Sequence, residues 1–77
     1  MKDIKVLGPG CVNCKNTTAL IERIAQEKGL AINLQKVEDL RDILSYGVMS
    51  TPGVVVDGKV VHAGGVPSRE KVELWLV

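Results

Sequence analysis

The strongest local signal in the chain is a pair of β-branched segments joined by the dipeptide Asp57-Gly58. The segment Gly53–Val56 precedes this dipeptide and the segment Lys59–His62 follows it. Valine-rich segments favour strands, and a two-residue Asp-Gly connection suits the tight turn of an antiparallel hairpin. We therefore expect a β-hairpin in the second half of the chain, and the other elements must join or cover the sheet to which it belongs.

Two strands and a long helix are predicted ahead of the hairpin. Residues 2–7 alternate charged and aliphatic side chains and stop at Gly8-Pro9-Gly10, as expected of a strand that ends in a turn. From about residue 12 to residue 28 the apolar side chains recur with helical spacing, and Gly29 supplies the C-terminal stop. Residues 30–37 alternate again, with a polar side that suggests a sheet edge.

Two shorter helices complete the prediction. Asp39 is a candidate N-cap for a helix that ends near Tyr46-Gly47, and Ser68 is a candidate N-cap for the last helix. The first of these helices carries Leu40, Ile43 and Leu44 on one face. The buried face of the last helix is predicted to carry Val72, Trp75 and Leu76.

The resulting order is β-α-β-α-β-β-α in an α/β fold. The first three elements form a parallel crossover, and the hairpin extends the same sheet with antiparallel strands. We predict a four-stranded mixed sheet of order 2-1-3-4 with helices on both faces. The chain of 77 residues is expected to be a single domain spanning 1–77, with an aliphatic core because it has one Trp, one Tyr and no Phe.

Charge and hydropathy exclude several classes of partner. The formal net charge is +1 and the basic residues are scattered, so neither nucleic acid nor an anionic membrane is expected to bind. No apolar run approaches the roughly 20 residues of a membrane span, and the first residues lack an apolar targeting segment. A cytoplasmic protein is therefore expected.

The chain has two cysteines, Cys11 and Cys14, at the start of the predicted long helix. In a chain without a secretion signal, this C-x-x-C spacing suggests redox chemistry or metal binding. A purely structural disulfide is a weaker explanation, because so small a loop restricts the unfolded chain little. The spacing alone leaves the redox and metal alternatives open.

Three features in order resemble the thioredoxin-like superfamily. They are Gly8-Pro9-Gly10-Cys11-Val12-Asn13-Cys14 between strand and helix, Met49-Ser50-Thr51-Pro52 before an apolar strand, and Gly64-Gly65 after the hairpin. The resemblance covers essentially all 77 residues and is closest to the small glutaredoxin-like redox-active disulfide proteins of bacteria and archaea. It implies a thiol-disulfide oxidoreductase that acts as an electron carrier.

The position of the two cysteines predicts different roles for them. Cys11 faces the unpaired N–H groups and the positive end of the helix dipole, which favour a thiolate. Cys14 lies one turn further in, covered by the helix. Cys11 is therefore predicted to attack a target disulfide and Cys14 to resolve the mixed disulfide, while Val12 and Asn13 tune the potential.

The resemblance also implies binding residues and partners. It implies a cis bond at Thr51-Pro52, with the Thr51 backbone pairing with an extended substrate segment. It also implies that a turn at Gly64-Gly65 meets a peptide carboxylate, although a plain loop explains this turn equally well. The implied partners are protein disulfide substrates and a reductase. No cofactor beyond the disulfide and no metal are expected, and the protein is expected to be a monomer.

The sequence departs from the family pattern in several places. No Trp precedes Cys11 and no Pro lies between the cysteines. Lys5 stands where larger thioredoxins carry a buried acid that assists the second cysteine, so the proton acceptor for Cys14 must be another group or water. Met49 could shield the sulfurs, but it is expected to fill the core. His62 could be a pH-sensitive neighbour or a metal ligand, but it is expected to be a half-exposed strand residue.

Two alternatives of other classes stay open. A soft-metal carrier or sensor also places C-x-x-C between a strand and a helix, but such domains run β-α-β-β-α-β. A non-catalytic binding module with the same fold is compatible with the missing Trp and with Lys5.

Overall fold

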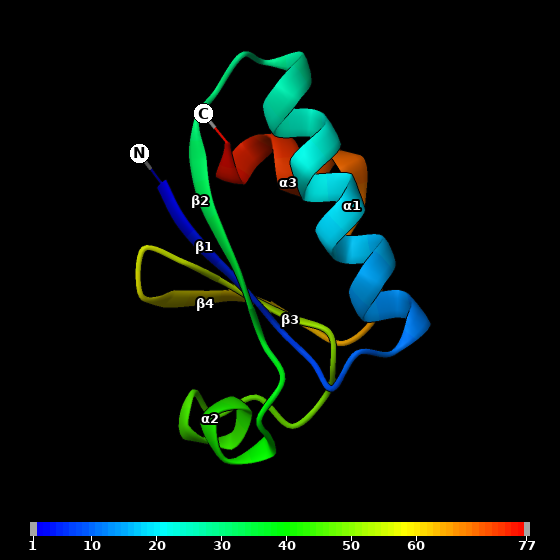
Figure 1. Ribbon diagram of the computed structural model, residues 1–77, viewed down its shortest axis with the longest axis vertical. Helices are drawn as coiled ribbons and strands as arrows, with labels where there is room; N and C mark the ends of the chain where they lie inside the picture. Colours follow the sequence, from blue (N-terminus) through cyan, green and yellow to red (C-terminus); the bar gives the residue numbers. More distant parts are fainter. Residues whose placement is uncertain (1, 77) are drawn as a thin grey trace.

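A computed structural model describes residues 2–76; the two end positions of the predicted domain, 1 and 77, lie outside the described residues. Its elements follow the predicted order (Figure 1): β1 (Lys2–Leu7), α1 (Val12–Glu27), β2 (Ile32–Val37), α2 (Leu40–Ser45), β3 (Gly53–Val56), β4 (Lys59–Ala63) and α3 (Arg69–Trp75). The strands form one four-stranded sheet of order β2-β1-β3-β4. Both predictions are confirmed.

The pairing within the sheet is mixed. β1 runs parallel to β2 and antiparallel to β3, so that Val6 lies opposite Lys36 on one side and Val54 on the other. The predicted hairpin joins β3 to β4 through Asp57 and Gly58, whose φ angles of 49° and 85° are those of a tight hairpin turn. β1 is thus a central strand, and it leads directly into the loop that holds the cysteines.

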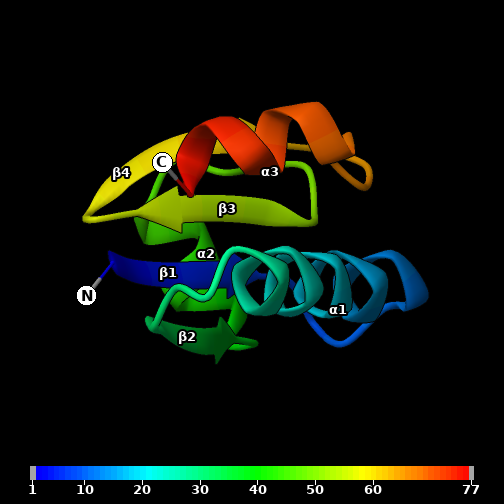
Figure 2. The same ribbon diagram turned by 90° about the horizontal axis from the view of Figure 1, so that it is seen from above.

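Helices cover both faces of the sheet, as predicted. Figure 2 shows α1 and α3 on one face and α2 on the other. Under α1 and α3 lies the larger core cluster, which contains Ile4, Val6, Ile21, Ile24, Ala25, Val54, Val72 and Leu76. Under α2 lies a smaller cluster of Leu7, Ile43, Val48 and Val55. The core is therefore aliphatic, and β1 contributes to both of its halves.

The predicted helix ends are confirmed by their caps. The Asp39 side chain accepts a hydrogen bond of 2.8 Å from the Arg41 amide, and the Ser68 hydroxyl accepts one of 3.2 Å from the Lys71 amide. Each bond satisfies one of the amides that a helix start leaves unpaired. Gly29 has a φ of 64° and follows the C-cap of α1, where the left-handed conformation favours glycine.

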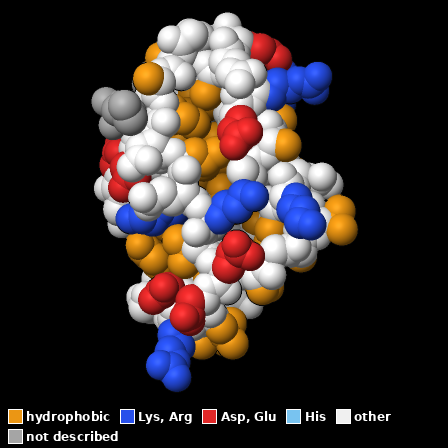
Figure 3. Space-filling view, viewed as in Figure 1, with side chains coloured by type: hydrophobic (Ala, Val, Ile, Leu, Met, Phe, Trp, Pro, Cys, Tyr) orange, Lys and Arg blue, Asp and Glu red, His pale blue; other side chains and the backbone are white. Residues whose placement is uncertain are grey.

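One prediction about the core is wrong, and another holds only in part. Met49 does not fill the core, because its side chain is 90% exposed in the connection that follows the buried Val48. On α2, Ile43 is buried whereas Leu40 and Leu44 are 64% and 53% exposed. A helix of six residues that meets the sheet along one line buries few of its side chains. Figure 3 shows hydrophobic side chains at the surface near α2.

Trp75 and His62 lie near each other at the edge of the larger core. Trp75 is half-buried and packs against the cluster, as predicted for a core residue. The centroid of the ring of His62, a half-buried residue of β4, lies 6.0 Å from the centroid of the Trp75 ring.

No helix among residues 2–76 has the length and apolar character needed to cross a membrane.

Candidate active site

The two cysteines form a disulfide at the start of α1, and their Cα atoms are 5.1 Å apart. Cys11 is the N-cap residue of α1 and is half-buried. Cys14 lies in the first turn of the helix and is only 5% exposed. The structure therefore gives the two sulfurs different surroundings, with Cys11 toward solvent and Cys14 toward the interior.

The start of α1 favours negative charge on the Cys11 sulfur. The Cys14 amide donates a hydrogen bond of 3.2 Å to Cys11 Sγ. The first turn of this fully described helix contains no acidic residue. Amide groups and the positive end of a helix of 16 residues stabilise negative charge on a sulfur at this place.

Two buried threonines fix the first turns of α1. The Thr17 hydroxyl donates to the Asn13 carbonyl at 2.8 Å, and the Thr18 hydroxyl donates to the Cys14 carbonyl at 3.1 Å. Both residues face the sheet, where an unpaired hydroxyl would be costly. These bonds hold the helical turn that carries Cys14 in place.

Gly8 gives the Cys14 sulfur the space that it occupies. A Cβ atom added to Gly8 would overlap Cys14 Sγ and would lie 3.7 Å from the Thr51 Cβ atom. The backbone of this loop is tied to the sheet because the Gly8 amide donates to the Val37 carbonyl at 2.9 Å. Gly8, Cys14 and Thr51 therefore meet at one point, although they come from three separate segments.

The residues predicted to bind substrate are grouped beside this point. The peptide bond between Thr51 and Pro52 is cis, and Pro52 is buried. The Gly64 amide donates to the Pro52 carbonyl at 2.9 Å, which brings the turn after β4 against the proline. Gly65, next in the same turn, offers its carbonyl to His62 Nε2 at 2.9 Å.

The two residues between the cysteines lie on the surface. Val12 is 71% exposed, and Asn13 is exposed beside it. Met49 and Val66, which is 42% exposed, belong to the two segments that approach each other through Pro52 and Gly64. Apolar side chains therefore reach the surface in each of the three segments that build the site.

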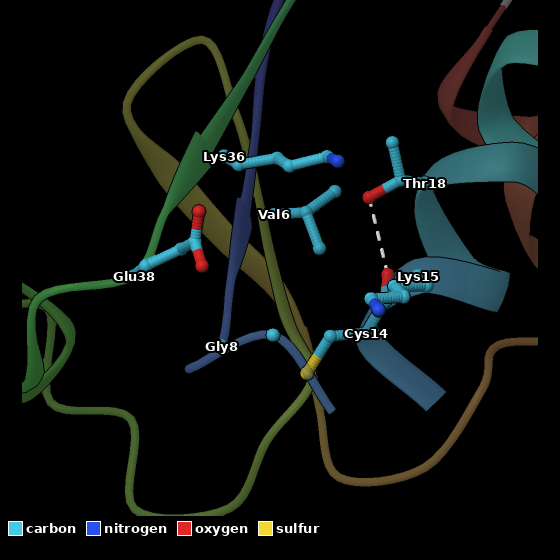
Figure 4. A pocket seen from close by; sticks show the side chains of 8 residues that line it. Val6, Gly8, Cys14, Lys15, Thr18, Lys36 and Glu38 are labelled. Carbon is cyan, nitrogen blue, oxygen red and sulfur yellow. Dashed lines mark hydrogen bonds between the residues drawn. The ribbon is translucent and has the colours of Figure 1, made fainter. Parts of the chain in front are cut away.

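A pocket of about 190 Å³ opens next to Cys14, between α1 and the β1–β2 side of the sheet (Figure 4). Lys15 and Thr18 line it from α1, and Lys36 and Glu38 line it from β2 and the residue that follows β2. The other lining residues are Val6, Gly8, Gly10 and Cys14. Cys14 thus lines a pocket to which charged side chains also contribute.

The sequence analysis did not identify Lys36 and Glu38 as site residues. Both are exposed and belong to a segment that reads as an edge strand with a polar side. The available signal was the parallel pairing of the first two strands, since the register that places Lys36 beside Val6 also brings Glu38 toward the loop after β1. That register becomes certain only in the folded sheet.

Lys5 does not take part in this pocket. Alternation along β1 turns it away from Val6, toward the face covered by α2. Its ammonium lies 3.6 Å from the Asp3 carboxylate, and interactions with the Tyr46 side chain, followed by Asp3, raise the pKa of Lys5. Lys5 is thus a cation on the other face of the sheet.

Among residues 2–76 there is no group of three or more His, Cys, Asp or Glu side chains placed to hold a metal ion.

Comparison with known proteins gives a consistent result. Residues 2–77 match the family model described as a thioredoxin domain. A thioredoxin of Methanothermobacter thermautotrophicus is 30% identical over 73 residues, which cover 95% of this chain and 95% of that protein. A thioredoxin of Methanocaldococcus jannaschii is 33% identical over 70 residues, which cover 91% of this chain and 80% of that protein. The chain therefore belongs to the thioredoxin family.

Proposed function

We propose that this protein is a thiol-disulfide oxidoreductase in which Cys11 is the nucleophile and Cys14 the resolving thiol. The observation that carries the proposal is the asymmetry of the pair, with Cys11 as the half-buried N-cap of a long helix and Cys14 buried one turn inside it. Only the thiolate form of a cysteine attacks a disulfide, so the group that is more easily ionised and reached acts first.

The proposed reaction has two exchange steps. The Cys11 thiolate attacks one sulfur of a target disulfide, forms a mixed disulfide and releases the other target sulfur as a thiolate, which takes a proton from water. Cys14 then loses its proton and attacks Cys11 Sγ, and the second target sulfur leaves with the bonding electron pair. The protein ends as the Cys11–Cys14 disulfide and the target as a dithiol, and a reductase must return two electrons for the next cycle.

The segments around the disulfide suit an extended protein substrate. Thr51 lies just ahead of β3 beside the Cys14 sulfur, and we propose that its backbone pairs with the substrate chain. Gly64 and Gly65 would form the neighbouring wall. The exposed Val12 and Met49 offer apolar contacts, and Val12 and Asn13 are proposed to tune the potential. The names of the thioredoxin relatives support protein disulfides as the substrate class.

The proposal needs no cofactor besides the disulfide. A reductase of unspecified type is the second proposed partner. The monomeric state and the cytoplasmic location stay predictions.

Trapping tests the two roles directly. In Cys14→Ser, reduced protein mixed with a disulfide-bonded model protein should accumulate a mixed disulfide at Cys11, because the resolving thiol is missing. Cys11→Ser should not form a mixed disulfide at a comparable rate. The alkylation rate of Cys11 against pH should give a pKa below the ~8.5 of a free thiol.

Turnover separates the alternatives. Wild-type protein with dithiothreitol should reduce the model disulfide repeatedly, and Cys11→Ser should not. An unshifted Cys11 pKa together with no mixed disulfide would contradict the proposal and favour a binding module. Tight one-to-one binding of Cu(I) by the reduced protein, without turnover, would favour a metal carrier instead.

A further inference from the structure

The turn at Gly64-Gly65 borders the proposed substrate segment, and the inference drawn from it rests on the proposed function. Both glycines have left-handed φ angles, of 85° and 72°. Glycine has more backbone freedom than any other residue, so two glycines in succession hold one shape only where other groups fix them. The contacts of this turn therefore determine the shape of the surface that a substrate chain would meet.

Both glycines take part in hydrogen bonds that fix the turn. The Gly64 amide donates to the Pro52 carbonyl at 2.9 Å. The Gly65 carbonyl lies 2.9 Å from the Nε2 atom of His62. Because a carbonyl oxygen only accepts hydrogen bonds, Nε2 carries the proton and is the donor. The first bond joins the turn to the cis-proline segment, and the second joins it to β4.

The sheet and α3 hold the His62 ring in position for this bond. His62 pairs with Val54 of β3, and paired residues of neighbouring strands point to the same face of a sheet. Val54 belongs to the larger core cluster, so the ring lies on the face covered by α1 and α3. There the ring of His62 packs at 54° to the ring of Trp75, a usual arrangement of two rings at this distance. His62 is thus a half-buried donor that is supported from α3.

We propose that His62 positions the Gly64-Gly65 turn for an extended peptide chain and so determines a preference for peptide disulfides over small disulfides. A Cβ atom on Gly64 would lie 3.3 Å from the Cβ atom of Ser50, so the turn borders the segment in which Thr51 is proposed to pair with substrate. A small disulfide has no peptide chain that extends to this turn. His62 acts through the turn and takes no part in the exchange steps.

Two variants separate the hydrogen bond of His62 from the packing of its ring. His62→Phe keeps a ring against Trp75 and removes the donor. His62→Gln removes the ring and keeps an N–H group that can donate to a carbonyl. If His62 acted only by packing, His62→Phe would preserve peptide binding and His62→Gln would impair it. The positioning role requires the opposite order.

The peptide substrate is a short peptide with blocked ends and one central cysteine, supplied as its disulfide dimer with excess dithiothreitol. In His62→Phe we expect KM for this substrate to rise by roughly 3- to 10-fold with kcat unchanged, because one hydrogen bond no longer fixes a binding surface. In His62→Gln, KM should stay within about twofold of the wild-type value. Both variants should react at the wild-type rate with dithiodipyridine, a small uncharged disulfide whose released thiopyridone absorbs light.

Lys59→Phe is the matched control, since it places the same side chain at the exposed start of β4, at the end of the strand away from the turn. It should change neither KM nor the dithiodipyridine rate. A KM that does not rise in His62→Phe, or that rises at least as much in His62→Gln, overturns the positioning role and leaves the proposed function intact. Wild-type protein that turns over neither disulfide overturns the proposed function as well.

A measurement on the wild-type protein tests the same hydrogen bond even if His62→Phe does not fold. His62 is the one histidine of the chain, so its ring nitrogens can be assigned by NMR without a variant. In alkaline solution, where an imidazole is uncharged, we expect the nitrogen shifts to show the ring proton on Nε2. A proton on Nδ1 instead would leave Nε2 without a hydrogen to donate to Gly65 and would overturn the inference.

Discussion

At Gly8 the absent side chain is what allows the Cys14 sulfur to lie against β1 and Thr51. Its backbone has an ordinary conformation for any residue, so the requirement for glycine is one of space and not of φ. Gly8 therefore makes room for the sulfur of Cys14.

Gly8→Ala should therefore destabilise the reduced protein by about 1–3 kcal/mol, the usual cost of overpacking a close contact. Urea unfolding in the presence of a reductant measures this loss. The same substitution in a Cys14→Ala background should cost less, because the sulfur that the added methyl group meets is gone. An equal cost in both backgrounds would show that the contact with Cys14 is not the cause.

The residues of the site differ in how far the sequence could reveal them. Cys11 and Cys14 are apparent from their spacing and from the helix pattern that follows, because both signals are local. Glu38 carries no local signal, since an exposed acidic residue after an edge strand is unremarkable by itself. Its position in the pocket follows from the pairing of β1 with β2, which depends on the whole sheet.

At the scale of elements, α2 shows that a short helix can pack against the sheet with only a small part of its surface buried. The helix has six residues, and only Ile43 enters the cluster with Leu7, Val48 and Val55. The spacing of Leu40, Ile43 and Leu44 in the sequence places them on one face of a helix, and a helix does form there. Burial depends in addition on how the helix axis crosses the sheet, which periodicity does not specify.

Ile43 and Leu44 form a matched pair for measuring this difference. Ile43→Ala removes a side chain that is 1% exposed and should cost about 2–5 kcal/mol of unfolding free energy. Leu44→Ala, at a side chain that is 53% exposed, should cost less than about 1 kcal/mol. Thermal or urea unfolding of the two variants gives the comparison. Similar losses would indicate that α2 packs against the sheet differently.

Local signals account for most of the elements that were predicted correctly. The Asp57-Gly58 hairpin and the caps Asp39 and Ser68 are each specified by a few adjacent residues, and all appear where they were expected. Met49 was expected to fill the core because methionine often fills gaps between apolar side chains. In an irregular connection, tertiary contacts decide which side chains point inward. The neighbouring residues in the sequence therefore could not predict whether Met49 is buried.

At the scale of the whole molecule, a charged contact joins elements from opposite ends of the chain. Arg69, the first residue of α3, contacts the carboxylate of Glu27, the last residue of α1, and its Nε atom lies 3.2 Å from Glu73. The Arg69 contact lowers the pKa of Glu27, and the same contact raises the pKa of Arg69. Both helices also contribute residues to the larger core cluster.

The sign of the resulting pH dependence follows from the direction of the Glu27 shift. A carboxyl whose pKa is lower in the folded protein than in the unfolded chain stabilises the fold at pH values above its unfolded pKa. This contribution is lost as the pH falls through the lowered folded pKa. Because both side chains are well exposed, the contribution is small and is screened by salt.

Arg69→Gln should therefore be less stable than wild type at neutral pH, and the difference should shrink as the pH falls through the lowered folded pKa of Glu27, because the carboxylate then becomes protonated. Urea unfolding at a series of pH values, at low ionic strength, measures the difference. Arg41→Gln removes the same charge from α2 and should show no such pH-dependent loss. Added salt should reduce the Arg69 effect at neutral pH. A stability difference that stays unchanged from neutral pH into the acid range would mean that Arg69 acts through packing of its side chain on α1 and not through the carboxylate of Glu27.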